Sequence, residues 1–172
     1  PAWAWSSECR IPNRQPLREF EVAEDPTRFV FDTAIVDANG MPAHGSTFIT
    51  QGYIYPAGTL NGSNGVLADG SPEFPDKVLG EWTCRGWVVG DGMATGQGVS
   101  AVTTQLFHFG GDLQGWTLVS DGYETLEIGV PMTRAITGGV GPYGDRKGEL
   151  VQTLLGITDQ MGVSFHFAIE TR

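Results

Sequence analysis

Lysine, cysteine and long hydrophobic runs are scarce in this 172-residue sequence. Only two residues are lysine, and the 10 Lys and Arg stand against 20 Asp and Glu, which gives a formal net charge of −10. A chain with this charge repels phosphate backbones, so the composition argues against a nucleic-acid partner. No run of 18 apolar residues occurs, and the sequence therefore predicts no membrane-spanning helix.

The few cysteines and histidines argue against a metal site. His44, His108 and His166 do not stand at metal-ligand spacing from one another or from Cys9 and Cys84, and we expect no metal. Cys9 and Cys84 either form one disulfide, as an exported protein would allow, or remain two thiols. The sequence leaves the compartment open between the cytoplasm and export.

Sequence motifs for covalent hydrolysis, phosphoryl transfer and nucleotide binding are also missing. Neither Gly-x-Ser-x-Gly nor Gly-x-x-x-x-Gly-Lys occurs. Gly139, Gly141 and Gly144 match the spacing of a dinucleotide fingerprint, but a strand pattern follows them where that fingerprint needs a helix. We therefore expect no nucleotide cofactor.

Alternation of apolar and polar residues with a period of two dominates the rest of the chain. No segment keeps a helical period over three turns, and Gly-rich turns separate the alternating runs. The pattern predicts an all-β fold, a closed antiparallel eight-stranded barrel whose interior is either filled by side chains or holds one small ligand. The expected strands lie at 19–23, 29–36, 47–55, 79–89, 99–109, 116–128, 132–137, 149–155 and 163–170.

The chain divides into an N-terminal arm, residues 1–18, and a single barrel domain, residues 19–172. The arm contains Trp3 and Trp5, which need a surface to pack on, either the outside of the barrel or a neighbouring subunit. We therefore expect the chain to self-associate.

Three stretches resemble plant allene oxide cyclases. The first is Phe-His-Phe-Gly-Gly at 107–111 followed by Trp-Thr-Leu-Val-Ser-Asp-Gly at 116–122. The second is the Gly-rich hairpin at 135–152, of which dirigent proteins share a looser form, and the third is Phe-Glu-Val-Ala-Glu at 20–24. The resemblance covers residues 19–170 and implies an allene oxide cyclase-like, dirigent-like barrel of lipocalin-like, calycin type that forms a homodimer or homotrimer. Proteins of that fold are commonly dimers or trimers, hold a hydrophobic substrate inside the barrel and use no cofactor.

The resemblance also implies site residues. Glu21 matches the cyclase glutamate at the cavity floor, and Ala23 stands where the cyclases have a water-binding asparagine. Cys84 lies two residues out of register from a cavity cysteine, a shift that keeps the same strand face. A carboxylate in a dry barrel has a raised pKa, so we expect Glu21 to act as a general base or to stabilise a developing cation.

Other candidates come from the residues themselves. His108 and His166 are candidates for acid–base work as a pair, and Glu81 and Arg85 are catalytic candidates on a strand of which either face could line the cavity. Each is set against an ordinary structural role. Aromatic faces can hold a cation, and phenol groups can donate to a substrate oxygen. The candidate substrate-binding residues are Tyr53, Tyr55, Trp82, Cys84, Trp87 and Tyr123.

These features predict a cofactor-free isomerase or cyclase that steers a small hydrophobic intermediate, in natural-product biosynthesis for example, inside the barrel. The alternative is a dirigent-like or lipocalin-like binding protein for a hydrophobic small molecule, with no chemistry of its own. A buried ionisable group with a perturbed pKa in the cavity favours the enzyme, and a purely apolar cavity favours the binding protein.

Overall fold

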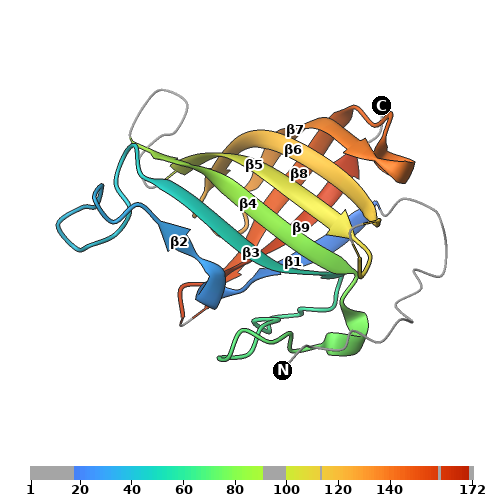
Figure 1. The fold of residues 1–172 in the computed structure, drawn as a ribbon, viewed down its shortest axis with the longest axis horizontal. Coiled ribbons are helices and arrows are strands. Elements are labelled where there is room, and N and C mark those ends of the chain that lie inside the picture. The colour runs from blue at the N-terminus through green and yellow to red at the C-terminus, as the bar shows by residue number, and fades with distance from the viewer. Residues whose placement is uncertain (1–17, 91–99, 113, 159, 171–172) are drawn as a thin grey trace.

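The strands of this chain close into a barrel (Figure 1). The computed structural model describes residues 18–90, 100–112, 114–158 and 160–170. Eight antiparallel strands follow one another in the order β1-β9-β8-β7-β6-β5-β4-β3, and pairing of β1 with β3 closes the ring. The predicted eight-stranded, all-β antiparallel barrel is confirmed. The strands are β1 Glu19–Glu24, β3 Thr47–Pro56, β4 Gly80–Val89, β5 Ser100–Phe109, β6 Trp116–Thr125, β7 Pro131–Val140, β8 Gly148–Ile157 and β9 Val163–Glu170.

The strand predicted at 29–36 is mostly wrong. Only β2, Val30–Phe31, pairs with the edge of β3, and the chain then turns away. The Asp32 carboxylate accepts the backbone N–H of Ala34, and the Asp37 carboxylate accepts those of Asn39 and Met41. Such local bonds offer the backbone an alternative to the sheet ladder, so the segment loops over one end of the barrel. Helix within the described ranges is limited to three short 3₁₀ turns, η1 Pro26–Arg28, η2 Pro75–Lys77 and η3 Gly141–Tyr143.

Aromatic side chains fill the other end of the barrel. Phe20 stacks on Phe167 with ring centroids 5.3 Å apart and meets Phe107 and Phe109 edge to face at 5.0 and 5.4 Å. All four rings are buried. Such pairs contribute about 0.5–1.5 kcal/mol each beyond the area that they bury. This end is therefore closed by packing, and any ligand space lies toward the opposite end.

The Gly-rich stretch forms the expected hairpin, with β7 and β8 joined through η3. Gly141 has φ +65°, and a Cβ there would lie 2.6 Å from the ring of Trp116. Only glycine accepts both this left-handed backbone and this close approach. The glycines therefore specify the turn and not a phosphate site.

A long loop between β3 and β4 covers part of the outer surface of the barrel. Tyr55 donates its hydroxyl to the carbonyl of Gly65 at 2.6 Å, and Tyr53 donates to that of Gly70 at 2.8 Å. Both tyrosines are buried. A second apolar cluster forms under the loop, made of Ala23, Tyr53, Tyr55, Leu60, Val66 and Val78. As a result β1 is buried on both faces.

Candidate active site

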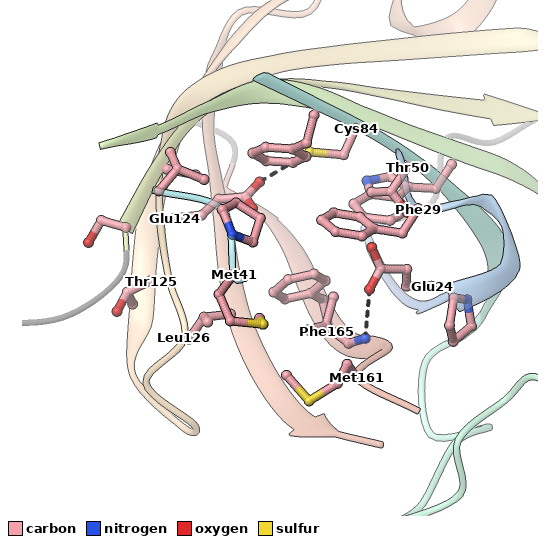
Figure 2. Close-up of a pocket in the computed structure, with 18 of the residues that line it drawn as sticks. Glu24, Phe29, Met41, Thr50, Cys84, Glu124, Thr125, Leu126, Met161 and Phe165 are labelled. Carbon is pink, nitrogen blue, oxygen red and sulfur yellow. Dashed lines mark hydrogen bonds between the residues drawn. The ribbon is translucent and has the colours of Figure 1, made fainter. Parts of the chain in front are cut away.

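A cavity of about 230 Å³ opens at the end of the barrel opposite the phenylalanine cluster (Figure 2). Its barrel walls carry the rings of Phe48, Trp82 and Phe165, with the ring centroids of Trp82 and Phe165 6.1 Å apart. Met41 and Met161 lie at the mouth and are 47% and 62% exposed. The cavity is thus mostly apolar and aromatic, with flexible thioether side chains where a ligand would enter.

Two carboxyl groups interrupt this apolar lining. Glu24 is the last residue of β1, and Glu124 stands one residue before the end of β6. Figure 2 shows the two side chains on different walls of the cavity. In the sheet, β9, which carries Phe165, lies between β1 and β6. Burying two carboxyl groups in a small apolar space costs free energy unless each has partners or a proton. Their different partners therefore decide what each can do.

Glu124 is surrounded by donors. Its Oε1 accepts hydrogen bonds from the Thr103 hydroxyl at 2.6 Å and from the Gln105 side-chain amide, and the Cys84 thiol lies 3.7 Å away. The Arg134 guanidinium forms an ion pair with the same oxygen at 3.3 Å. An ionised carboxylate only accepts hydrogen bonds, so this all-donor environment suits the charged form.

The Arg134 side chain is fully buried and fixed at every nitrogen. It donates to the Ser120 hydroxyl at 3.2 Å, to the Tyr123 carbonyl at 3.2 Å and to the Thr103 carbonyl at 3.0 Å. Burial lowers the pKa of Arg134, and the charge of Glu124 opposes that change. Arg134 balances the charge of Glu124 inside the barrel wall, and it is not among the residues that line the cavity.

Gln105 connects this ion pair to the aromatic wall. Its Oε1 accepts the indole N–H of Trp82 at 3.3 Å, and its Nε2 donates to Gln152 at 2.9 Å as well as to Glu124. Gln105 and Gln152 are both buried. These bonds fix the orientation of the Gln105 side-chain amide, with its nitrogen toward Glu124. Oε1 of Glu124 thus accepts hydrogen bonds from Thr103, Gln105 and Arg134. Within the described part of the chain no donor reaches Oε2 of Glu124, which leaves that atom for a ligand.

Glu24 has the opposite surroundings. Burial raises the pKa of Glu24, and the negative charges of Glu124 and Asp25 raise it further. The backbone N–H of Val163, which donates to Oε2 at 2.9 Å, and the nearby Thr50 hydroxyl act in the other direction without cancelling the shift. Because Oε2 accepts a backbone N–H, the proton of the neutral acid belongs on Oε1. Glu24 is therefore suited to donate a proton and Glu124 to accept one.

Cys84 lines the cavity but is not prepared to act as a nucleophile. It is a free, buried cysteine, and burial raises the pKa of its thiol well above the usual value. The nucleophilic form of cysteine is the thiolate, which this environment disfavours. Cys84 instead presents a thiol to Glu124. Cys9, the other half of the disulfide considered from the sequence, lies outside the described residues.

Only two of the residues selected from the sequence line the cavity, Trp82 and Cys84. The others lie on the outer face of the barrel. Glu81 accepts the side-chain amide of Gln51, His108 meets the Thr117 hydroxyl at 3.1 Å, and His166 lies 3.8 Å from Glu19. Trp87 and Tyr123 are 55% and 43% exposed. The remaining outer-face residues are Glu21, Tyr53, Tyr55 and Arg85.

Glu21 lies on the face opposite to the cavity side expected for it. In β1 the side chains of Phe20 and Val22 enter the barrel core, so the alternation turns Glu21 outward. There the β3–β4 loop buries it, and its two oxygens accept the backbone N–H groups of Gly58 and Leu60, each at 2.8 Å. Glu21 therefore anchors the β3–β4 loop to the outer face of β1.

Replacing Glu21 by alanine should therefore weaken the fold and leave the cavity unaltered. The Gly58 and Leu60 N–H groups would lose a charged acceptor, the Leu60 group in a buried hydrogen bond, which costs about 1–3 kcal/mol of unfolding free energy. Chemical denaturation would measure the change, with Glu170→Gln, an exposed carboxyl at the end of β9, as the control. Unchanged stability together with altered ligand binding would contradict this assignment.

The sequence analysis missed Glu24, Glu124, Arg134 and Gln105. A signal for Glu24 was present, because it shares a strand face with Phe20 and Val22. Glu124 likewise shares a face with the buried residues Leu118 and Ser120. An ionisable residue at the end of an inward-facing row is the pattern that would have pointed to this site.

Comparisons with known proteins establish the fold. No protein-family model matches the sequence, and no curated protein matches it either. Among solved structures, two pterocarpan synthase dirigent proteins superpose with TM-scores of 0.57 and 0.55 at 15% and 13% identity. They cover 87% of this chain each, and 88% and 82% of their own chains are matched. The barrel is dirigent-like in fold.

A pyocyanin demethylase also superposes on this barrel. It superposes with a TM-score of 0.54 at 15% identity, over 88% of this chain and 98% of its own. Identity this low transfers the architecture and not the chemistry. Within the described ranges no three His, Cys, Asp or Glu side chains gather into a metal-binding group, and no helix there has the length and apolar character needed to cross a membrane.

Proposed function

We propose that this dirigent-like barrel is a cofactor-free isomerase or cyclase that moves protons on a small hydrophobic molecule held in the cavity. The observation that carries the proposal is the carboxyl pair, Glu24 and Glu124, in one aromatic cavity. Two titratable groups with opposite surroundings suit a general acid and a general base. The aromatic walls would hold one reactive conformer, which lowers the barrier further.

The comparisons support a small organic substrate. Structural neighbours include a pyocyanin demethylase and two pterocarpan synthase dirigent proteins, so in other proteins this barrel architecture is associated with small hydrophobic molecules. The sequence resemblance to allene oxide cyclases supports an isomerising or cyclising reaction. The alternative, a binding protein without chemistry, is less favoured because the cavity contains a buried carboxyl group whose pKa is raised.

Isomerisation and cyclisation without a co-reactant leave the mass of a compound unchanged, which provides a test. Incubated with an apolar extract of its native cells, the protein should deplete one compound and produce another of equal mass, as followed by liquid chromatography and mass spectrometry. Glu124→Gln keeps shape but removes the base, and should slow this conversion by about 10²-fold or more. A co-purifying compound that the protein binds but never converts would favour the binding protein instead.

Glu24→Gln tests the other carboxyl group in the same conversion assay. It also shows whether lost activity is caused by unfolding. Because the pKa of Glu24 is raised, the folded protein holds its proton more tightly than the unfolded chain, and stability falls as pH rises from the usual carboxyl range toward that raised pKa. Glutamine cannot ionise, so Glu24→Gln should melt at or above the temperature of the parent at pH 7 while conversion slows. Glu170→Gln should convert normally. A Glu24→Gln variant that converts at the parent rate would remove Glu24 from the mechanism.

A further inference from the structure

We propose that the substrate is a neutral, flat ring compound carrying an enolisable ketone, whose oxygen meets Glu24 Oε1 and whose neighbouring C–H faces Glu124 Oε2. This inference rests on the proposed function and deepens it by naming the substrate class. It follows from three features of the cavity: the free atoms of its two carboxyl groups, its charge balance and the shape of its walls.

The free carboxyl atoms define what a ligand must offer. Glu24 has its Oε2 fixed by the backbone N–H of Val163, so its remaining oxygen is the donor of the neutral acid. Glu124 has its Oε1 occupied by donors from β5 and β7, so its remaining oxygen is the acceptor. A ligand that satisfies both must place an acceptor at one wall and a removable hydrogen at another. A ketone with an α-hydrogen has both groups.

The charge balance favours a neutral ligand. The charge of Glu124 is already compensated by Arg134 at 3.3 Å, and burial favours the neutral form of Glu24. An anionic ligand would meet no uncompensated positive charge, since Arg134 is not among the lining residues. A cationic ligand would compete with Arg134 for Glu124. A neutral carbonyl compound needs no counter-ion inside the barrel.

The walls favour a flat ring system. Trp82 and Phe165 face the cavity from β4 and β9, and Phe48 faces it from β3. Their rings offer extended faces on which a planar molecule stacks. The volume of about 230 Å³ is below the roughly 300–1,000 Å³ of pockets for drug-sized ligands, so the cavity suits a skeleton of about two fused rings.

The chemical step balances without a co-reactant. Glu124 takes a proton from the α-carbon, and the electron pair of the broken C–H bond forms the C=C bond of an enol. At the same time Glu24 gives its proton to the carbonyl oxygen. In a ketone conjugated with a C=C bond, Glu124 then returns its proton to a different carbon while Glu24 takes the proton back from the enol oxygen, which yields an isomer. In a cyclisation the enol carbon attacks a second carbonyl carbon of the same molecule, whose oxygen takes the proton from Glu124, and the first oxygen returns its proton to Glu24. Either route restores both carboxyl groups to their starting states.

Hydrogen–deuterium exchange tests the step without the natural substrate. The probe is 2-tetralone, a two-ring ketone with acidic hydrogens next to its carbonyl, dissolved in D₂O with the full-length protein. Proton NMR should show the α-hydrogen signals disappearing at least about tenfold faster than in buffer alone. Glu124→Gln should remove this acceleration, Glu24→Gln should reduce it, and Glu170→Gln should preserve it.

Quenching of tryptophan fluorescence by 2-tetralone, followed for each variant, separates binding from catalysis. Normal binding by Glu124→Gln together with lost exchange supports the proposal. Exchange no faster than in buffer, with or without binding, overturns it, as does acceleration that Glu124→Gln retains. If the protein interconverts compounds of equal mass in the cell extract but fails this exchange test, the ketone assignment falls and the isomerase proposal stands. If exchange occurs but no equal-mass conversion is found, the isomerase proposal fails and the ketone assignment stands.

Discussion

Replacing Arg134 by methionine should lower the free energy of unfolding by about 3–5 kcal/mol, because it leaves a buried carboxylate without its cation. Arg134 is fully buried, and its partner Glu124 has a side chain only 14% exposed. The substitution also removes donors from the Ser120 hydroxyl and from the Thr103 and Tyr123 carbonyls. Methionine keeps an unbranched chain of comparable length, so lost packing is a small part of the effect.

Urea denaturation of the variant would measure this change, and two further proteins interpret it. Adding Glu124→Gln to Arg134→Met removes the stranded charge and should restore much of the lost stability, although the carbonyls remain without a donor. Arg85→Met, at an exposed position on the outer face of β4, should shift stability by no more than about 0.5 kcal/mol. If Arg134→Met loses less than about 1 kcal/mol, the ion pair between Arg134 and Glu124 does not contribute to stability as a buried pair.

Replacing Gly52 by valine should prevent normal closure of the barrel. Gly52 lies in β3 opposite Glu24 of β1, at the seam where β1 pairs with β3 and closes the barrel. A Cβ at Gly52 would lie 2.1 Å from the carbonyl oxygen of Ala23 and 2.8 Å from the Cα of Glu24. Both contacts are with backbone atoms in a paired strand, which cannot move without breaking the ladder. We expect a loss of about 4 kcal/mol or more, or failure to fold.

Circular dichroism, gel filtration and denaturation would follow the Gly52→Val variant. Gly138→Ala is the matched control, because a Cβ at Gly138 of β7 meets nothing within 4 Å. That control should change stability by less than about 1 kcal/mol. A Gly52→Val protein as stable as the parent would show that β1 and β3 can separate enough at this point to accept a larger side chain. A folded variant with weaker 2-tetralone exchange would instead show that the seam positions Glu24.

Several features of this protein could be predicted from local sequence because their cause is local. The two-residue alternation in β4 and β9, and the glycines of the β7–β8 hairpin, depend only on side-chain direction and backbone freedom. The strand predicted at 29–36 failed for a local reason as well, since Asp32 and Asp37 bind nearby N–H groups. Those bonds compete with the ladder, and apolar alternation alone does not report them.

The sequence by itself determined the all-β barrel, its turns, the acidic charge and the pairing of residues into strand faces. It did not determine which face of each strand is inside, because alternation is symmetrical until another element covers one side. In β1 both faces are buried, and the β3–β4 loop decided that Glu21 anchors a loop while Glu24 enters the cavity. The placement of Glu24 and Glu124 in one cavity also depends on tertiary structure, since only closure of β1 on β3 brings the first strand round to the cavity that β6 lines.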